Sequence, residues 1–223
     1  MSKNKTKQKQ QPKPTLVAFL LDRTGSMDCC KEETIKGFNG YIAGLRKQKD
    51  ECIFTLTQFD TQGIDVIHDG VALSKVSPLT QSSYQPRGST NLYDAMATTM
   101  EAAQGKAGGK YKVLFVTLTD GQENASVRFN KDAVQKMIKE REDQDHWTFA
   151  HIGVGIDGFG AGQSIMQGSK SFANNVRYSH KDQAAALQRL ANCTNTYRSS
   201  ISTQCCVDTD FYKKDVDTPE EAA

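Results

Sequence analysis

The sequence lacks any apolar stretch approaching the roughly 18 residues that a helix needs to cross a bilayer. Its longest apolar run, Leu16 to Leu21, has the length of a buried strand. The N-terminal residues are rich in Lys and Gln and lack the apolar core of a signal peptide. These absences argue against membrane insertion and lead us to expect a cytoplasmic location.

Net charge and the spacing of the cysteines argue against further classes of protein. The formal net charge of +2 is too small to argue for a nucleic-acid partner. The six cysteines show no C-x-x-C spacing, which disfavours a zinc ribbon or a thioredoxin site. They form two adjacent pairs, Cys29–Cys30 and Cys205–Cys206, and two singles, Cys52 and Cys193, so we expect reduced thiols and no disulfide framework. The histidines also lack metal-ligand spacing and are interpreted as structural or surface residues: His68, His146, His151 and His180.

Composition predicts one globular domain between two tails. A chain of 223 residues with 37% hydrophobic and 24% charged residues suits a single α/β domain. Residues 1–14 contain five lysines and no acid, which is typical of a disordered, solvated tail. We place the domain at 15–200 and a C-terminal tail, acid-rich from Asp208, at 201–223.

Strand-like and helix-like segments alternate along the domain. Expected strands cover Leu16–Leu21, Cys52–Phe59, Ile64–Ile67, Val113–Leu118, Trp147–Val154 and Val176–Tyr178. Expected helices cover Ile35–Leu45, Leu92–Ala103, Val134–Ile138 and Ala184–Ala191. The turn Thr61-Gln62-Gly63 predicts a hairpin at the sheet edge. This order predicts an α/β, Rossmann-like doubly wound fold: a mostly parallel central sheet with helices on both faces and one antiparallel edge strand.

Three loops of this expected fold carry short oxygen side chains. In such sheets, ligands bind outside the carboxyl ends of the strands. Asp22-Arg23-Thr24-Gly25-Ser26 follows the first strand, Gly88-Ser89-Thr90-Asn91 precedes a helix, and Thr119-Asp120-Gly121 follows another buried strand. Together the loops offer two carboxylates and three hydroxyls.

The three loops resemble the metal-ion-dependent adhesion site of von Willebrand factor type A (vWA) domains. The first resembles the family's D-x-S-x-S, the second its separate threonine and the third its T-D-G, in the family's order. Thr24 stands where the motif usually has serine and keeps the hydroxyl. The resemblance covers roughly residues 15–200.

The resemblance implies a ligand set. It assigns hydroxyl ligands of a divalent ion to Thr24, Ser26 and Thr90, with Asp22 and Asp120 acting largely through bound waters. Mg²⁺, with Mn²⁺ or Ca²⁺ as substitutes, prefers such oxygen ligands. Because neutral hydroxyls leave most of the ion's charge uncompensated, an Asp or Glu from a protein partner would complete the site. A chaperone-like ATPase is one partner that the resemblance suggests.

Each loop also has an ordinary structural interpretation. Asp22 and Asp120 could cap helices or turns, and Thr90 could be the N-cap of the helix at Leu92. Four further carboxylates near strand ends are interpreted as turn or rim residues: Asp60, Asp69, Glu123 and Asp157. Glu123 and Asn124 could border the site.

Two functions fit an oxygen-ligated metal site at strand ends. The first is a metal-dependent protein-binding module without catalysis, which we favour. The alternative is a metal-dependent hydrolase or phosphotransferase. Against the alternative, the sequence shows neither a D-x-D-x-T nucleophile motif after a strand nor a P-loop.

Overall fold

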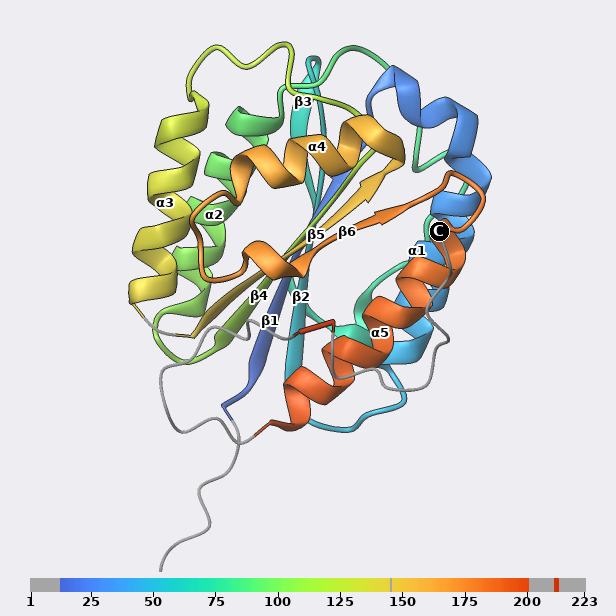
Figure 1. Ribbon diagram of the computed structural model, residues 1–223. Helices are drawn as coiled ribbons and strands as arrows, with labels where there is room; N and C mark the ends of the chain where they lie inside the picture. Colours follow the sequence, from blue (N-terminus) through green and yellow to red (C-terminus); the bar gives the residue numbers. More distant parts are fainter. Residues whose placement is uncertain (1–12, 145, 201–210, 213–223) are drawn as a thin grey trace, which may run out of the picture.

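A computed structural model describes residues 13–144, 146–200 and 211–212 (Figure 1). Its centre is a sheet of six strands in the order β3-β2-β1-β4-β5-β6. The strands are β1 (Thr15–Asp22), β2 (Cys52–Asp60), β3 (Gly63–Ala72), β4 (Lys112–Thr119), β5 (Trp147–Val154) and β6 (Asn175–Tyr178). All pairs are parallel except β2 with β3. The expected parallel sheet with one antiparallel edge strand is confirmed.

Helices cover both faces of the sheet (Figure 1). One layer contains α1 (Lys31–Leu45) and α5 (Gln183–Ser199), which pack against each other. The other contains α2 (Leu92–Ala107), α3 (Lys131–Asp143) and α4 (Gly155–Ile165). Short 3-10 helices occur at η1 (Gly25–Cys30), η2 (Leu73–Lys75) and η3 (Phe172–Asn174).

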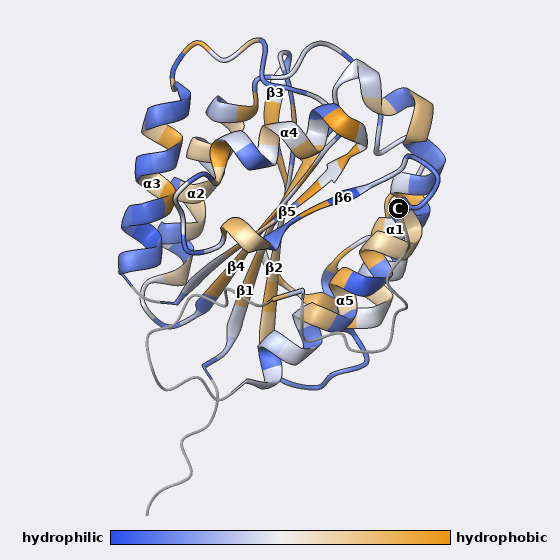
Figure 2. Cartoon of the chain, in the orientation of Figure 1, coloured by the Kyte–Doolittle hydropathy of each residue, from blue (hydrophilic) through white to orange (hydrophobic). Residues whose placement is uncertain are grey.

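Strand β1 shows why two layers are needed. Val17, Phe19 and Leu21 belong to the core under α1 and α5. Leu16, Ala18 and Leu20 belong to the core under α2, α3 and α4. Successive side chains point to opposite faces of a strand, so a continuous apolar run must be covered on both sides. Figure 2 shows the apolar strands at the centre and polar residues on the outer helix surfaces.

The strand order places a switch point between β1 and β4. The chain runs outward from β1 through β2 to the edge strand β3, then returns to the other side of β1 with β4 and continues outward to β6. Ligands of doubly wound sheets bind outside the carboxyl ends of the strands where the order reverses. Here those ends are Asp22 of β1 and Thr119 of β4.

Helix α4 was not predicted from the sequence. Its segment, GIDGFGAGQSI, contains four glycines, which disfavour helix. Tertiary packing explains both the helix and its composition. A Cβ added to Gly158 would overlap the Thr119 carbonyl oxygen, and one added to Gly162 would overlap the His151 ring. The glycines let α4 approach the ends of β4 and β5 closely.

The expected tails lie mostly outside the described residues, including Cys205 and Cys206. Two residues within the acid-rich C-terminal stretch are described and differ from the expectation of a solvated tail. Phe211 and Tyr212 are buried in the core under α1 and α5. Among the described residues, every helix is too short or too polar to cross a membrane.

Candidate functional site

Asp22, the last residue of β1, is fully buried at the switch point. Its Oδ1 accepts a hydrogen bond of 2.7 Å from the backbone N–H of Thr24, and its Oδ2 accepts one from the hydroxyl of Thr119. Its backbone carbonyl accepts a 2.6 Å bond from the Tyr84 hydroxyl. The first of these bonds confirms the turn interpretation for Asp22, and the second ties the ends of β1 and β4 together.

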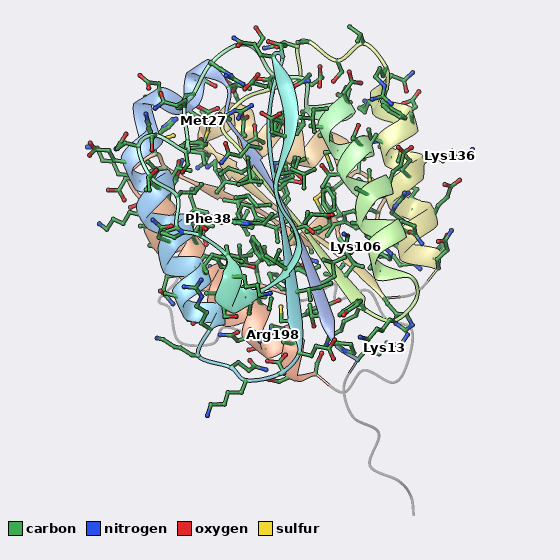
Figure 3. All side chains as sticks on the ribbon, turned by 180° about the vertical axis from the view of Figure 1, so that it is seen from behind. Lys13, Met27, Phe38, Lys106, Lys136 and Arg198 are labelled. Carbon is green, nitrogen blue, oxygen red and sulfur yellow. The ribbon has the colours of Figure 1, made fainter. Side chains whose placement is uncertain are left out.

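The first and third loops meet through side chains. The hydroxyls of Thr24 and Ser26 lie 3.2 Å apart, and the Ser26 hydroxyl donates a 2.6 Å bond to Asp120 Oδ1. Thr24 and Asp120 are 1% and 8% exposed, so the cluster opens to solvent mainly at Ser26. Figure 3 labels Met27 of this loop at the end of the molecule opposite Lys13 and Arg198.

The second loop brings Thr90 to the same place. A Cβ added to Gly121 would lie 3.3 Å from Thr90 Oγ1 and 3.7 Å from Ser26 Oγ, so both hydroxyls border the same small volume. The Gly25 N–H donates a 3.1 Å bond to the Gly88 carbonyl and joins the first loop to the second. The five predicted site residues therefore converge from three loops.

The interpretation of Thr90 as a helix cap is wrong. The N-cap of α2 is Asn91, whose side chain makes no capping bond, and the N–H groups of Tyr93 and Asp94 donate to Glu123 and to the Ser126 hydroxyl. The Thr90 backbone is instead fixed by Asn124, whose Oδ1 accepts a 2.9 Å bond from the Thr90 N–H and whose own N–H donates to the Thr90 carbonyl. The Thr90 hydroxyl is thus available at the site.

Burial shapes the electrostatics of the two carboxylates. It raises the pKa of Asp22 to about 7, against the opposing effect of hydrogen bonds from Thr119 and Thr24. Burial also raises the pKa of Asp120, while the Ser26 hydrogen bond and the nearby His180 lower it. A divalent cation beside these groups would favour their ionised forms.

Neighbouring residues support the site in ways that the sequence did not predict. Thr119, the threonine of T-D-G, holds Asp22 through its hydroxyl. Arg23, buried behind the loop, pairs with Asp60 and Asp65 at 2.7 Å each. Asp60 is fully buried, so its interpretation as a rim residue is wrong, whereas its Oδ1 accepts a 2.6 Å bond from the Gln62 N–H, which confirms the turn interpretation. An arginine within the motif and an acid at the end of the adjacent strand were the available sequence signals.

The other three carboxylates that were expected at turns or at the rim of the site each have a defined partner. Glu123 accepts bonds from the backbone N–H groups of Tyr93, Ala125 and Ser126 and so fixes the loop after Asp120. Asp157 accepts a 2.9 Å bond from Gln122, which places the start of α4 beside the same loop. Asp69 forms an exposed ion pair with Lys106.

The donor set fits a hard cation. Hydroxyl and carboxylate oxygens are the ligands that Mg²⁺ prefers. Adjacent ligands in an octahedron with bonds of about 2.1 Å lie about 3 Å apart, close to the 3.2 Å between the Thr24 and Ser26 hydroxyls. These two hydroxyls therefore have nearly the separation of neighbouring ligands of one ion.

Solved structures provide the comparison. Proximal thread matrix protein 1 from the mussel byssus matches with a TM-score of 0.57 and 15% identity over 80% of this chain and 47% of that one. A von Willebrand factor type A protein from Catenulispora acidiphila matches with a TM-score of 0.54 and 14% identity over 81% and 42%. The VWA domain of SpRpn10 matches with a TM-score of 0.51 and 10% identity over 79% and 94%.

The chain has the fold of a vWA domain. It spans less than half the length of the first two proteins and nearly all of the SpRpn10 VWA domain. No protein-family model and no curated protein matches the sequence. At these identities the vWA likeness describes the fold, and function has to be argued from the site.

Proposed function

We propose that this vWA-like chain binds one Mg²⁺ or Mn²⁺ ion at the three loops and uses it to hold a protein partner. The convergence of the Thr24, Ser26 and Thr90 hydroxyls with Asp22 and Asp120 at the switch point carries the proposal. The three hydroxyls would be direct ligands. The two carboxylates would orient bound waters and balance the charge of the ion.

The charge of the proposed ligand set favours a partner that contributes a carboxylate of its own. Three hydroxyls contribute no formal charge, and Mg²⁺ takes about six oxygen ligands. Three hydroxyls and two carboxylate-held waters leave one position. An Asp or Glu of the partner would occupy it and form a charge-assisted contact with the cation.

Exposed apolar side chains near the same loops support a protein as the partner. Ile156, at the start of α4, is 76% exposed, and Val127, in the loop between β4 and α3, is 90% exposed. The bond between Gln122 and Asp157 places the start of α4 beside the loop that carries Asp120. Apolar side chains around a charged anchor are typical of protein-binding surfaces.

Isothermal calorimetry with Mn²⁺ tests the metal site. Thr90→Val removes one hydroxyl at nearly constant shape, and we expect the Mn²⁺ affinity to fall by about tenfold or more. Thr99→Val is the matched control, because Thr99 is a buried threonine of α2 whose hydroxyl has no hydrogen-bond partner. Equal Mn²⁺ affinity in wild type and Thr90→Val would reject the ligand set.

A pull-down from the native host tests the partner. We expect a protein that wild type and Thr99→Val retain, that EDTA releases, that Mg²⁺ or Mn²⁺ restores, and that Thr90→Val fails to retain. Ca²⁺ should restore it less well, because its longer bonds suit a compact site poorly. A partner retained equally by all samples would show that the loops are not the binding surface.

The proposal makes the chain a binding module and not an enzyme. A phosphatase and nucleotidase panel with Mg²⁺ or Mn²⁺ separates it from a hydrolase or phosphotransferase. Turnover by wild type that is lost in Thr90→Val and kept in Thr99→Val would favour the catalytic alternative.

A further inference from the structure

Two thiols lie beside the oxygen cluster. Cys29 and Cys30 end the 3-10 helix η1, which begins at the first loop. Their Sγ atoms and a carboxylate oxygen of Asp120 all lie within 4.8 Å of one another. Cys29 is exposed and Cys30 is buried, so the group reaches from solvent into the protein.

Hydrogen bonds hold the three side chains in place. Cys29 Sγ lies 3.2 Å from the Ser26 carbonyl, and Cys30 Sγ lies 3.4 Å from the Met27 carbonyl. The Thr34 hydroxyl donates a 3.0 Å bond to the Cys30 carbonyl and fixes the start of α1. Asp120 is held by Ser26. Both thiols therefore face Asp120 on a short, well-bonded turn, although they are neighbours in the sequence.

The chemistry of this group differs from that of the oxygen cluster. Thiolate sulfur is a soft ligand that selects Zn²⁺ and similar ions, whereas Mg²⁺ prefers hydroxyls and water. In tetrahedral sites Zn–S bonds are about 2.3 Å and Zn–O bonds about 2.0–2.2 Å, so ligand atoms lie about 3.5–4 Å apart. The three ligand atoms, all within 4.8 Å of one another, lie near that geometry.

We propose that Cys29, Cys30 and Asp120 form a second metal site, which takes a thiophilic divalent cation of the Zn²⁺ class. Three protein ligands leave a fourth tetrahedral position for water or an external ligand, and exposed Cys29 provides the route of entry. Metal binding displaces the thiol protons, so affinity increases with pH.

Asp120 would belong to both sites. An ion held by Asp120 and the two thiols draws this carboxylate away from the oxygen cluster and places a second positive charge beside it. A Zn²⁺-class ion would therefore weaken Mg²⁺ or Mn²⁺ binding at the hydroxyls. This competition rests on the proposed function, whereas the second site itself does not.

Co²⁺ reports thiolate ligation directly, because sulfur ligands give ultraviolet charge-transfer bands and tetrahedral geometry gives strong visible bands. The measurement uses the full chain, reduced, with Cys205→Ser and Cys206→Ser so that these thiols do not contribute. We expect one thiolate-bound Co²⁺ per chain with both sets of bands, displaced by one equivalent of Zn²⁺. Cys29→Ser, Cys30→Ser and Asp120→Asn should each weaken binding by about tenfold or more.

Cys52→Ser is the matched control for a lost thiol. Cys52 is buried at the first residue of β2, at the opposite end of the sheet, and the Co²⁺ bands should not change. Should Cys30→Ser fail to fold, Cys29→Ser decides, because an exposed side chain tolerates the change. Unchanged Co²⁺ bands and affinity in Cys29→Ser would overturn the proposal.

The same measurements test the two proposed metal sites independently of each other. Thr90→Val should lose Mn²⁺ affinity and keep the Co²⁺–thiolate bands, while Cys29→Ser should do the reverse. Thiolate bands without Mn²⁺ binding in any variant would leave the second site standing and reject the oxygen site. Mn²⁺ binding without thiolate bands in wild type would reject the second site alone.

Discussion

Buried polar side chains at the carboxyl ends of the strands are fixed by specific partners. Arg23 is a strong example: its side chain is 8% exposed and pairs with Asp60, whose side chain is fully buried. Removing one member of a buried pair leaves an uncompensated charge, which costs about 3–5 kcal/mol. Arg87 also reaches Asp60, at 3.0 Å, and shares that charge. These contacts hold the first loop against β2 while Asp22 and Thr24 face the site.

His151 predicts a pH dependence of stability. Burial lowers the pKa of His151 to about 4, while its Nε2–H donates a 2.9 Å bond to the Gly158 carbonyl. In the unfolded chain the pKa is about 6.5, so the unfolded state binds more protons between these values and stability falls as the pH drops from about 6.5 towards 4. We expect His151 to account for a loss of about 2 kcal/mol between pH 7.5 and 5.

Urea unfolding of wild type and His151→Gln at both pH values isolates this contribution. The raised pKa of Asp22 acts in the opposite direction, since the folded state then binds the extra proton. It acts equally in both proteins, so the difference between their pH dependences reports His151. The same pH dependence in both proteins would contradict the prediction.

Helix α4 is the element that tertiary contacts control most. It follows β5 directly and packs on β5 and β6. Gly158 lies against the Thr119 carbonyl and the Asp120 Cα, so the position of the helix is linked to the third loop of the site. A helix rich in glycine gains little from intrinsic propensity, and its stability depends on this packing.

Two alanine substitutions in α4 separate propensity from packing. Gly158→Ala should destabilise the protein by about 1–3 kcal/mol, because its Cβ would overlap the Thr119 carbonyl oxygen. Gly160→Ala, with no atom within 4 Å of the added Cβ, should stabilise it by about 0.4–1 kcal/mol. Thermal unfolding should show shifts of opposite sign. A stabilised Gly158→Ala would mean that the helix does not approach β4 so closely.

At the scale of the whole molecule, the layer of α1 and α5 is completed by a segment that follows α5 in the sequence. Phe211 and Tyr212, the short red segment near α5 in Figure 1, are 1% and 5% exposed. The Phe211 ring lies 6.2 Å from that of Tyr197, and the Tyr212 carbonyl accepts a 3.1 Å bond from Arg189. The core therefore includes residues beyond the end of α5.

Phe211→Ala tests this extension of the core. Truncating a buried phenylalanine costs about 3–5 kcal/mol, so the variant should melt well below wild type. Phe172→Ala is the control, because Phe172 is 45% exposed and its loss should cost about 1 kcal/mol or less. Equal melting temperatures for the two variants would show that residues 211–212 do not stabilise the domain. If Phe211→Ala still binds Mn²⁺ below its melting temperature, Phe211 stabilises the domain without contributing to the metal site.

The sequence by itself determined the layered sheet and the five candidate ligands. The apolar run Leu16–Leu21 must be covered on both faces, and the alternating segments then predict parallel strands whose carboxyl ends meet at one edge. Asp22 and Asp120 follow strands of that sheet, so their proximity was predictable once Leu16–Leu21 and Val113–Leu118 were identified as strands. Short polar loops after apolar runs carry a strong local signal.

Tertiary structure decided the features that depend on close approach between distant segments. The glycines of α4 suggest a loop when only the sequence is considered. In the folded protein the segment forms a helix that packs against Thr119 and His151, where a Cβ at Gly158 or Gly162 would overlap its neighbours. Three contacts join positions 34 to 91 residues apart in the sequence. Arg23 pairs with buried Asp60, Asn124 accepts a hydrogen bond from the Thr90 N–H, and Cys29 and Cys30 lie beside Asp120. No local pattern encodes such contacts, because their geometry is set by the packing of the whole sheet and its two helix layers.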